Sequence, residues 1–528
     1  MKKSSRKKNA RGTTGRSPKA PYDGAVAGRS PQALTKIARA ITGRSPQARY
    51  DAAGTGRRMR GWNPPKSGPN LAMAGVELLR ARARDAERND WAGESASQRW
   101  VTNLVGWGIT PRLSRFKAGA RKEELQKLWD EWVPNSDADC VLNFYAQQAL
   151  VVRAWLGAGE VFVRRRVRDE SYGMAVPLQL QVIEADYVPM LDLDQDPRLP
   201  IGNRVRSGIE LNKRGKRVAY WLHREHPGDN TGGVIDQSQL LRIPAAEIAH
   251  IYEVKRPGQL RGVPPLAATL ARLRMIGDYD DAVLERQKLA NLFVAFITRG
   301  LGDGATDPLT GLSLEYAEDG GSLMPLSPGI MQELGHGENV QFSNPPEAGT
   351  TYSDYMRTQH LGTAAAAGLP YEIFSGDIAN VSDRTLRMLV NEFRRFAEQR
   401  QWLTIIPMFC QRARDWWTDA AVLAGQVNMA EAADVAQVAW APHGWAYIHP
   451  VQDVQGKQME VQAGFRSRSS VIGERGDDPE QVDAERKADQ DRADKLGLAP
   501  AIAGVGAPAD PAASQPEDQN DNRRVAPG

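Results

Sequence analysis

The sequence predicts an α+β fold in which helices surround a small β-rich part and a compact insert. Apolar residues recur at three- and four-residue intervals along most of the chain, and short β-rich runs cluster between residues 161 and 254. The 528 residues, 41% of them hydrophobic, are enough for a sizeable core. Because no run of about 18 apolar residues occurs, no membrane span is expected, and because the first 20 residues contain no apolar segment, no secretory signal is expected.

The two ends of the chain have compositions that do not favour folding. Residues 1–60 hold 16 Lys and Arg against 2 Asp and Glu, which is +14, and repeat GRSP at Gly15, Gly28 and Gly43. Residues 61–528 hold 52 basic against 62 acidic groups, which is −10. We therefore expect a disordered basic arm over 1–60 and a disordered Pro/Ala/Asp-rich tail over 499–528. The arm is either a solvated leader or an electrostatic contact with nucleic acid or an acidic partner.

The first part of the folded body alternates helical and β-type patterns. Helical spacing covers residues 71–100, 118–132 and 141–156, and the last helix ends at the GAGE sequence of 157–160. The β-rich runs that follow predict a meander or small sheet, with strands at 161–167, 178–183, 217–223 and 249–254.

Next, two helices flank an insert. One begins at Pro265, where a helix tolerates proline, and its apolar stripe runs over about 36 Å through Leu266, Leu270, Leu273, Ile276, Val283 and Gln287. The insert to about Gly349 includes strands at 292–298 and 339–343, and the second helix spans 352–368. This order predicts a protruding hairpin that carries the insert at its far end.

A further helix follows the segment GLPYEIFSGDIANVSD of 368–383. Ser382 or Asp383 can cap it, and it is expected to continue to about Trp402. Its predicted buried stripe consists of Leu386, Leu389, Val390, Phe393, Phe396 and Ala397. Helices are also expected at 405–422 and 481–495.

No familiar catalytic or cofactor pattern is present. The sequence contains no GxxxxGK[ST], GxSxG or HExxH, which disfavours an autonomous ATPase, a hydrolase of that type and a zinc protease. We therefore expect no enzyme activity, no cofactor, no metal site and no catalytic residue. Cys140 and Cys410 stand alone and are expected to be small buried hydrophobic residues.

Other chemical candidates are also weak. The stretch DLDQDP at 192–197 begins like a calcium loop but has Pro197 where Gly is needed, so it is expected to be a solvated acidic turn. His223 and His226 lie at the end of a predicted strand, where no set of carboxylate or Cys ligands is expected beside them, and are expected to be surface histidines. The Gly-rich run at 299–311 is expected to be a flexible loop.

Several segments in the same order resemble the lambda family of tailed-bacteriophage portal proteins. They include GWGITP (106–111), GEVFVRRR (159–166), LQLQVIEADYV (178–188), GIELNKRGKRVAYWLHREHPGD (208–229), IPAAEIAHIYEVKRPGQLRGVPPLA (243–267), AAAAGLPYEIFSGD (364–377) and parts of 449–482. The resemblance covers about residues 60–495. The arm and the tail lie outside it.

The resemblance implies a portal-type fold with a mainly helical wing, stem and crown, a small β-rich sheet and a clip, assembled into a ring that usually has twelve subunits. Its domains would be the wing at 61–263, the first stem helix at 264–290, the clip at 291–349, the second stem helix at 350–368, the channel loop at 369–383, a long helix and wing return at 384–440, and the crown at 441–498.

By the same resemblance, double-stranded DNA would be packaged and ejected through the ring at one vertex of the virion capsid, after assembly in the host cytoplasm. Implied partners are other copies of this chain, the terminase large subunit, the major capsid protein and head-completion or tail-connector proteins, but no membrane. The clip residues expected to dock terminase or connector proteins are Arg299, Asp303, Asp307, Glu315, Glu318 and Asp319.

The charge pattern supplies a hypothesis for the channel loop. No Lys or Arg occurs from Thr358 to Asp383, and a wall without cations would let duplex DNA slide without binding its phosphates. The residues expected to face DNA are Glu372, Ser375, Gly376, Asp377, Ile378, Ala379, Asn380, Val381, Ser382 and Asp383. Two alternatives remain: another DNA-binding virion or scaffold protein, or a DNA-processing enzyme, which would need a carboxylate cluster at metal-binding spacing.

Overall fold

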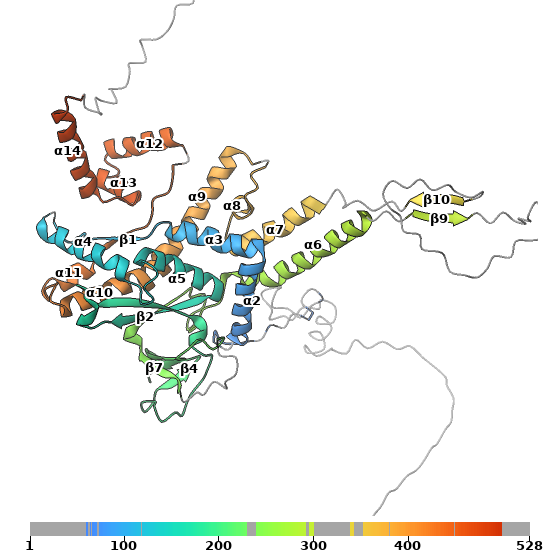
Figure 1. Cartoon of the computed structure of the whole chain (residues 1–528), viewed down its shortest axis with the longest axis horizontal. Coiled ribbons are helices and arrows are strands. Elements are labelled where there is room, and N and C mark those ends of the chain that lie inside the picture. The colour runs from blue at the N-terminus through green and yellow to red at the C-terminus, as the bar shows by residue number, and fades with distance from the viewer. Residues whose placement is uncertain are drawn as a thin grey trace, which may run out of the picture. The chain divides into compact units, whose positions relative to one another are not determined.

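The computed structural model of the chain describes residues 57, 60–61, 64, 66–70, 73–117, 119–229, 239–291, 295–299, 338–342, 352–379, 381–447 and 449–498. The chain divides into two compact units, Met1–Gly68 and Pro69–Gly528, and the elements below belong to the second. Figure 1 shows their order along the chain. None of the described helices is long and apolar enough to cross a membrane.

Four helices open this unit: α2 (Val76–Asn89), α3 (Trp91–Val105), α4 (Ala120–Trp132) and α5 (Phe144–Ala158). The predicted helix at 71–100 is therefore two helices, because the Asp90 backbone is extended and its side chain accepts the Ala92 N–H of α3. Their inner faces form the main core, which contains the buried rings of Trp100, Trp129 and Trp155.

Two antiparallel sheets follow, and they confirm the predicted β-rich part. The first has the order β3 (Leu178–Glu184), β2 (Glu160–Val167), β8 (Ile248–Tyr252). The second is a four-stranded meander of β4 (Arg204–Arg206), β5 (Ile209–Leu211), β6 (Arg217–Leu222) and β7 (Leu241–Pro244).

Strand β2 joins two cores because its side chains alternate between faces. Val161 and Val163 are buried in the main core with the helices. Phe162 points the other way, into a second core that it shares with residues of the meander such as Tyr220 and Ile243. A separate small pair joins β1 (Thr110–Arg112) to β11 (Ala439–Ala441).

The predicted hairpin with an insert is present. After a short 3-10 turn at Pro265–Ala268, α6 (Leu270–Asn291) leads to β9 (Ala295–Arg299), which pairs antiparallel with β10 (Glu338–Phe342) before α7 (Tyr352–Ala367). The two helices are antiparallel, because Arg272 donates to Gln359 at 2.9 Å while Tyr352 donates to Asp280. Leu266, Leu273 and Ile276 of the predicted stripe are buried. Figure 1 shows α6 and α7 together on one side of the unit.

After a short helix α8 (Tyr371–Ser375), one continuous helix runs from α9 (Asp383–Arg400) through wide π-helical turns at Gln401–Cys410 into α10 (Gln411–Leu423). Ser382 caps it, as predicted, by accepting the Thr385 N–H at 3.2 Å. The prediction for Phe396 was wrong: this ring is 48% exposed, whereas Phe393 and Ala397 are buried. Pro407 lies inside the π-helical turns, whose wider spacing accommodates a residue without an N–H.

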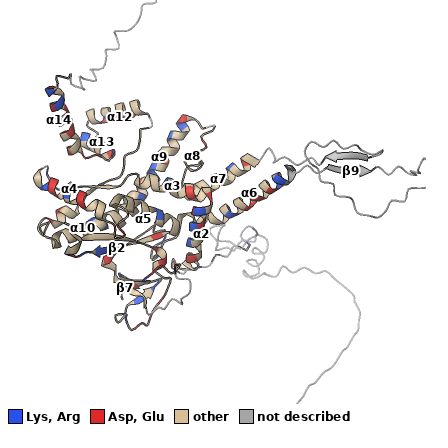
Figure 2. Ribbon diagram, viewed as in Figure 1, with Lys and Arg blue, Asp and Glu red and all other residues tan. Residues whose placement is uncertain are grey.

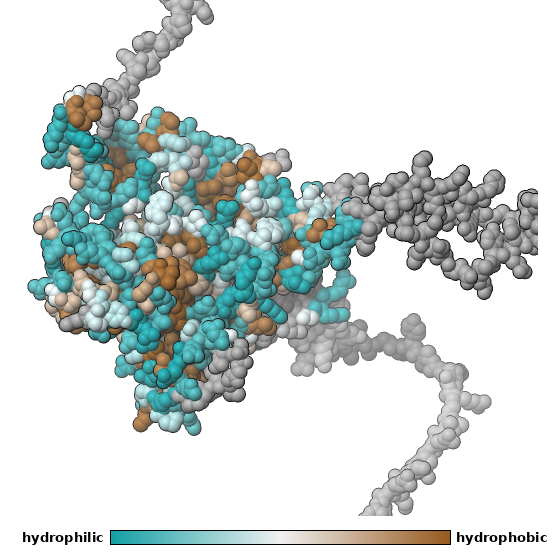
Figure 3. Space-filling model, in the orientation of Figure 1, coloured by the Kyte–Doolittle hydropathy of each residue, from teal (hydrophilic) through white to brown (hydrophobic). Residues whose placement is uncertain are grey.

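Four more helices complete the described chain: α11 (Ala432–Ala436), α12 (Pro450–Gln462), α13 (Arg468–Glu474) and α14 (Pro479–Lys495), the last confirming the helix predicted at 481–495. No residue of α12, α13 or α14 is buried. Figure 3 shows an apolar patch at the end of α14, where Leu496 and Leu498 are exposed.

The small sequence candidates have mixed outcomes. Cys410 is buried as predicted, but Cys140 is exposed, in a turn where its φ is 57°. The acidic stretch at 192–197 is a surface turn in which Arg206 pairs with Asp194 at 2.6 Å. His226 does have carboxylates nearby, contrary to expectation, because the end of β3 brings Glu184 to 3.3 Å from its Nε2.

Candidate functional site

The segment after α7 is anchored firmly at its first half. The Trp100 indole of α3 donates to the Ala367 carbonyl at 2.9 Å, and Ser95 donates to the Phe374 carbonyl. Leu369 and Phe374 are buried, and the Phe374 ring lies 5.7 Å from that of Trp91. Gly368 and Gly376, both with φ near 75°, make the two turns that bracket α8. The corner therefore rests on α3.

The second half of the segment is exposed. Ile378 is 68% exposed, although it is a large apolar residue, and Ala379 is also exposed. Asp377 shapes the turn by accepting the Ala379 N–H at 2.9 Å, and its own N–H donates to Ser375. Of the residues predicted to face DNA, the structure brings 375–379 and 381–383 together in one turn. Asn380 lies outside the described residues, and Glu372 is part of α8.

The acids of this segment are not bare, because arginines from the flanking helices pair with them. Arg357 of α7 lies 3.7 Å from Asp377, and Arg387 of α9 donates to Asp383. Residues 357–387 contain three Arg and three acids, so their formal charges cancel. The short helix α8 contains no Lys or Arg and shows no blue in Figure 2. The segment is thus close to neutral rather than acidic: Arg357 and Arg387 each face an acid, the exposed Arg384 of α9 has no described carboxylate partner, and the turn at 376–383 itself contains no Lys or Arg.

The predicted docking residues of the insert are described only in part. Arg299 is the last residue of β9 and is opposite Glu338 of β10 in the register. Asp303, Asp307, Glu315, Glu318 and Asp319 lie outside the described residues.

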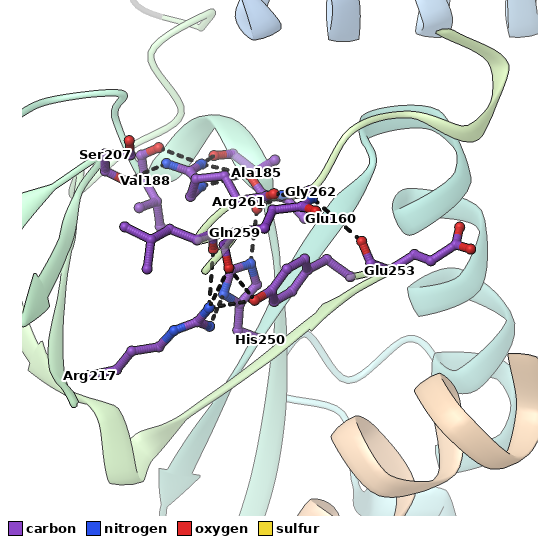
Figure 4. A network of polar contacts seen from close by, with 12 residues as sticks. Glu160, Ala185, Val188, Ser207, Arg217, His250, Glu253, Gln259, Arg261 and Gly262 are labelled. Atoms are coloured by element: carbon purple, nitrogen blue, oxygen red, sulfur yellow. Dashed lines mark hydrogen bonds and ion pairs between the residues drawn. The ribbon is translucent and has the colours of Figure 1, made fainter. Parts of the chain in front are cut away.

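A buried charge cluster lies where the sheets meet the chain that leads into α6. Its centre is Glu160, the first residue of β2, whose side chain is fully buried. One carboxylate oxygen accepts from Arg80 and from Arg261 Nε at 2.7 Å; the other accepts from His250 Nε2 at 2.9 Å and the Gly262 N–H at 2.7 Å. Figure 4 shows Arg261, His250 and Gly262 converging on this carboxylate.

Arg261 ties the two sheets together. Its remaining N–H groups donate to the carbonyls of Ser207 at 2.7 Å, Val188 at 2.9 Å and Ala185 at 3.2 Å, which lie beside the meander and at the end of β3. Next to it, Gly262 touches the backbone of Gly159 so closely that a Cβ would lie 2.0 Å from the Gly159 oxygen. The cluster therefore fixes the chain three residues before the turn that starts α6.

The electrostatics of the cluster favour one protonation state. The cationic Arg261 and Arg80 lower the pKa of Glu160 despite complete burial, and burial lowers the pKa of His250. Arg217 donates to His250 Nδ1 at 3.2 Å, so the proton of the neutral ring is on Nε2 and faces Glu160. The His250 ring also stacks between Phe162 and Tyr252, with centroids 4.3 Å from each.

Sequence reasoning missed this cluster. Two pairs of residues were the available signals. One is Gly159-Glu160, which puts a lone Glu at the start of an apolar strand, and the other is Arg261-Gly262, just before two prolines. Both pairs lie in segments that carried the family resemblance.

One group of described residues has ligand types suited to a metal: Glu184, Asp186 and His226. Arg84 already lies 3.0 Å from Glu184 and pairs with Asp186, so one guanidinium bridges both carboxylates. His226 Nδ1 accepts the Gly228 N–H at 3.0 Å, which puts the ring proton on the nitrogen that faces Glu184. The arrangement fits an ion-pair network better than a metal site.

These features define a class of structural assembly subunit. Two antiparallel helices carry an insert, a neutral turn follows the returning helix, and a buried charge cluster joins the helix root to two sheets. The family model for phage portal proteins of the lambda family matches residues 55–401. The chain belongs to this family.

The relatives agree with this assignment. A probable portal protein of Halomonas phage phiHAP-1 is 26% identical over 433 residues, covering 80% of this chain and 82% of the relative. Portal protein B of Escherichia phage lambda is 21% identical over 505 residues, covering 84% and 89%. Among solved structures, the neck of an empty gene transfer agent (GTA) particle matches with 15% identity and a TM-score of 0.43, over 82% of this chain and 99% of that one.

The chain is accordingly a component of the phage virion at the portal vertex of the capsid, the opening through which the family packages DNA. The sequence resemblance and the predicted α+β portal fold are thereby confirmed.

Proposed function

We propose that copies of this chain form a closed ring whose DNA path is lined by the turn at 376–383. In this proposal α6 and α7 are the stem, the insert between them is the clip, and 441–498 is the crown. The observation that carries it is the contrast within one corner: α8 is anchored on α3, whereas the following turn exposes Ile378 and holds no unpaired cation among its described residues.

The outer face of α9 supports the ring. Met388 and Phe396 of α9 are 67% and 48% exposed and lie about 80° apart around the helix at 100° per residue, and Leu403 in the π-helical turns that follow is 64% exposed. An exposed apolar ridge of this kind is typical of a protein interface. A ring needs a heterologous contact, in which this ridge meets a different surface of the next copy.

The Glu160 cluster gives the proposed stem a fixed root. Force on the stem during DNA passage would reach the sheets through Gly262 and Arg261, and a cluster with four donors on one carboxylate resists displacement. We further propose that the clip docks the terminase and later the connector proteins. The terminase supplies the ATP hydrolysis, so that this chain needs no catalytic residue.

The experiment for the channel assignment is a charge reversal, Asp377→Lys, followed by DNA packaging in vitro and by infection. The expected result is a packaging defect, because the new ammonium and the released Arg357 can both bind phosphate. The matched control is Asp194→Lys, an exposed acid that also pairs with an arginine but lies before the meander. Equal packaging by both variants would contradict the assignment, and negative-stain images without rings would contradict the ring.

A further inference from the structure

Strand β2 carries a row of arginines that the portal assignment does not use. Arg164, Arg166 and Arg168 alternate with Arg165 and Val167, so they share one face of the sheet. The Arg168 N–H donates to the Pro177 carbonyl at 2.9 Å, which continues the antiparallel pairing by one residue beyond β2. We call these three residues the arginine ladder.

Glutamines of the neighbouring strand hold the ladder in place. Gln181 and Gln179 of β3 are opposite Arg164 and Arg166 in the register. Gln181 accepts from Arg166 Nε at 2.9 Å and Gln179 accepts from Arg168 Nε at 2.6 Å. Among the described residues, the terminal guanidinium nitrogens of Arg166 and Arg168 have no hydrogen-bond acceptor, so they remain available to a ligand.

The described part of the chain does not neutralise the ladder. Within the described residues, Glu247 is the one carboxylate within 4.0 Å of a ladder guanidinium, and it lies 3.9 Å from Arg164. Burial and, after it, the charge of Arg166 lower the pKa of Arg164, so the like charges repel one another. This row stands out in a body whose net charge after residue 60 is −10.

On the opposite face of the same strand, an arginine has a carboxylate partner from a packed helix. Arg165 points away from the ladder and lies 3.7 Å from Asp419 of α10. Arg165 and Arg164 thus each have one carboxylate nearby, whereas no described carboxylate lies within 4.0 Å of the Arg166 or Arg168 guanidinium. The difference indicates that the ladder awaits an anion from outside the chain.

We propose that the arginine ladder binds the phosphate backbone of DNA outside the channel. Residues two apart on a strand are about 6.8 Å apart, which is close to the distance between neighbouring phosphates of one DNA strand. Guanidinium groups bind phosphate oxygens in bidentate fashion. The half-exposed Tyr172 ring, 4.9 Å from the Arg168 guanidinium, extends this surface. DNA is the polyanion that portals handle, so the choice of ligand rests on the portal function.

The test compares the full-length protein with the variant R164Q/R166Q/R168Q, using a fluorescent blunt DNA duplex between about 50 and 200 mM salt. Each phosphate contact contributes about 0.9 to the slope of log affinity against log salt, so the slope should fall by about 2 to 3. The variant R164K/R166K/R168K should retain most of the slope, because the charges remain. The basic arm is the same in all variants and cancels in the comparison.

Arg165→Gln is the control and should leave the slope unchanged. The proposal is overturned if the triple Gln variant has the slope of the unmodified protein, or if Arg165→Gln lowers it equally. It is also overturned if the triple variant binds DNA normally but loses binding to polyglutamate, since the ladder would then bind acidic protein. All variants should form rings in negative stain. If the unmodified protein formed no rings, the proposed ring would be contradicted. The DNA affinities of the variants could still be compared, so the two proposals can fail separately.

Discussion

The two ends of strand β2 hold arginine in opposite ways. At its start, Glu160 is fully buried and receives two guanidiniums, an imidazole and a backbone N–H. At its other end Arg164 lies 3.9 Å from Glu247, and no described carboxylate lies within 4.0 Å of the Arg166 or Arg168 guanidinium. The same strand therefore supplies a closed cluster, in which every charge has a partner, and an open row whose partner must come from elsewhere.

This difference shows that the partners of an arginine within the fold decide whether its guanidinium can bind a ligand. Arg261 cannot meet a ligand, because its donors are bound to Glu160 and to the carbonyls of Ser207 and Val188. Arg166 is held by a single glutamine contact at Nε. The closed end should accordingly determine stability, and the open end should determine binding.

The largest expected effect comes from breaking the closed end with Glu160→Gln. The variant leaves Arg80 and Arg261 buried without a counter-charge, so the free energy of unfolding should fall by about 3–5 kcal/mol. Urea unfolding followed by fluorescence measures it. Arg165→Gln, which removes a partly exposed pair of the same strand, should cost less than about 1 kcal/mol. Similar losses in both variants would remove the distinction between the two ends.

A second test concerns the backbone contact beside the cluster. Gly262→Ala places a Cβ 2.0 Å from the Gly159 oxygen and should destabilise the protein by about 1–3 kcal/mol. Gly277→Ala in α6 is the matched control, since its Cβ would meet nothing within 4 Å and a helix gains about 1 kcal/mol from the exchange. Thermal melting should therefore shift in opposite directions. A stable Gly262→Ala protein would show that the root of α6 is looser than the structure indicates.

Much of this fold could be predicted from the sequence, because helix and strand periodicities are local. The apolar stripe from Leu266 to Ile276, the strands at 161–167 and the Ser382 cap are examples. Phe396 was assigned to the core because it continues the local stripe, yet only packing decides which edge of an amphipathic helix is covered.

The candidate site could be predicted only in part. The scarcity of Lys and Arg around 358–383 is visible in the sequence, but the pairing of Asp377 with Arg357 depends on how α7 and the turn meet. In the Glu160 cluster, Arg80 and Gly262 are each about 80 to 100 positions away from Glu160 in the sequence. No short sequence window therefore contains the cluster.

The closed end should also be sensitive to acid through His250. Its pKa is lowered on folding, so the unfolded chain binds a proton as pH falls below the ordinary value of 6.5 while the native ring stays neutral. Stability is full above that value and should fall by about 2 kcal/mol by pH 5. His250→Gln keeps a donor for Glu160 but does not titrate. Its unfolding free energy should change less between pH 7 and pH 5, and an identical pH dependence would exclude His250 as the cause.

The smallest expected effect sharpens the open end. Glu247→Gln removes the carboxylate that lies 3.9 Å from Arg164. Unit charges about 4 Å apart in water interact by about 1 kcal/mol, so duplex affinity at low salt should rise by up to about fivefold. Asp419→Asn removes the partner of Arg165 on the other face and should leave the affinity unchanged. Both pairs are partly exposed, so stability should change by less than about 1 kcal/mol in either variant. If duplex affinity rose with Asp419→Asn and not with Glu247→Gln, DNA would bind the Arg165 face of β2. That result would contradict binding at the ladder.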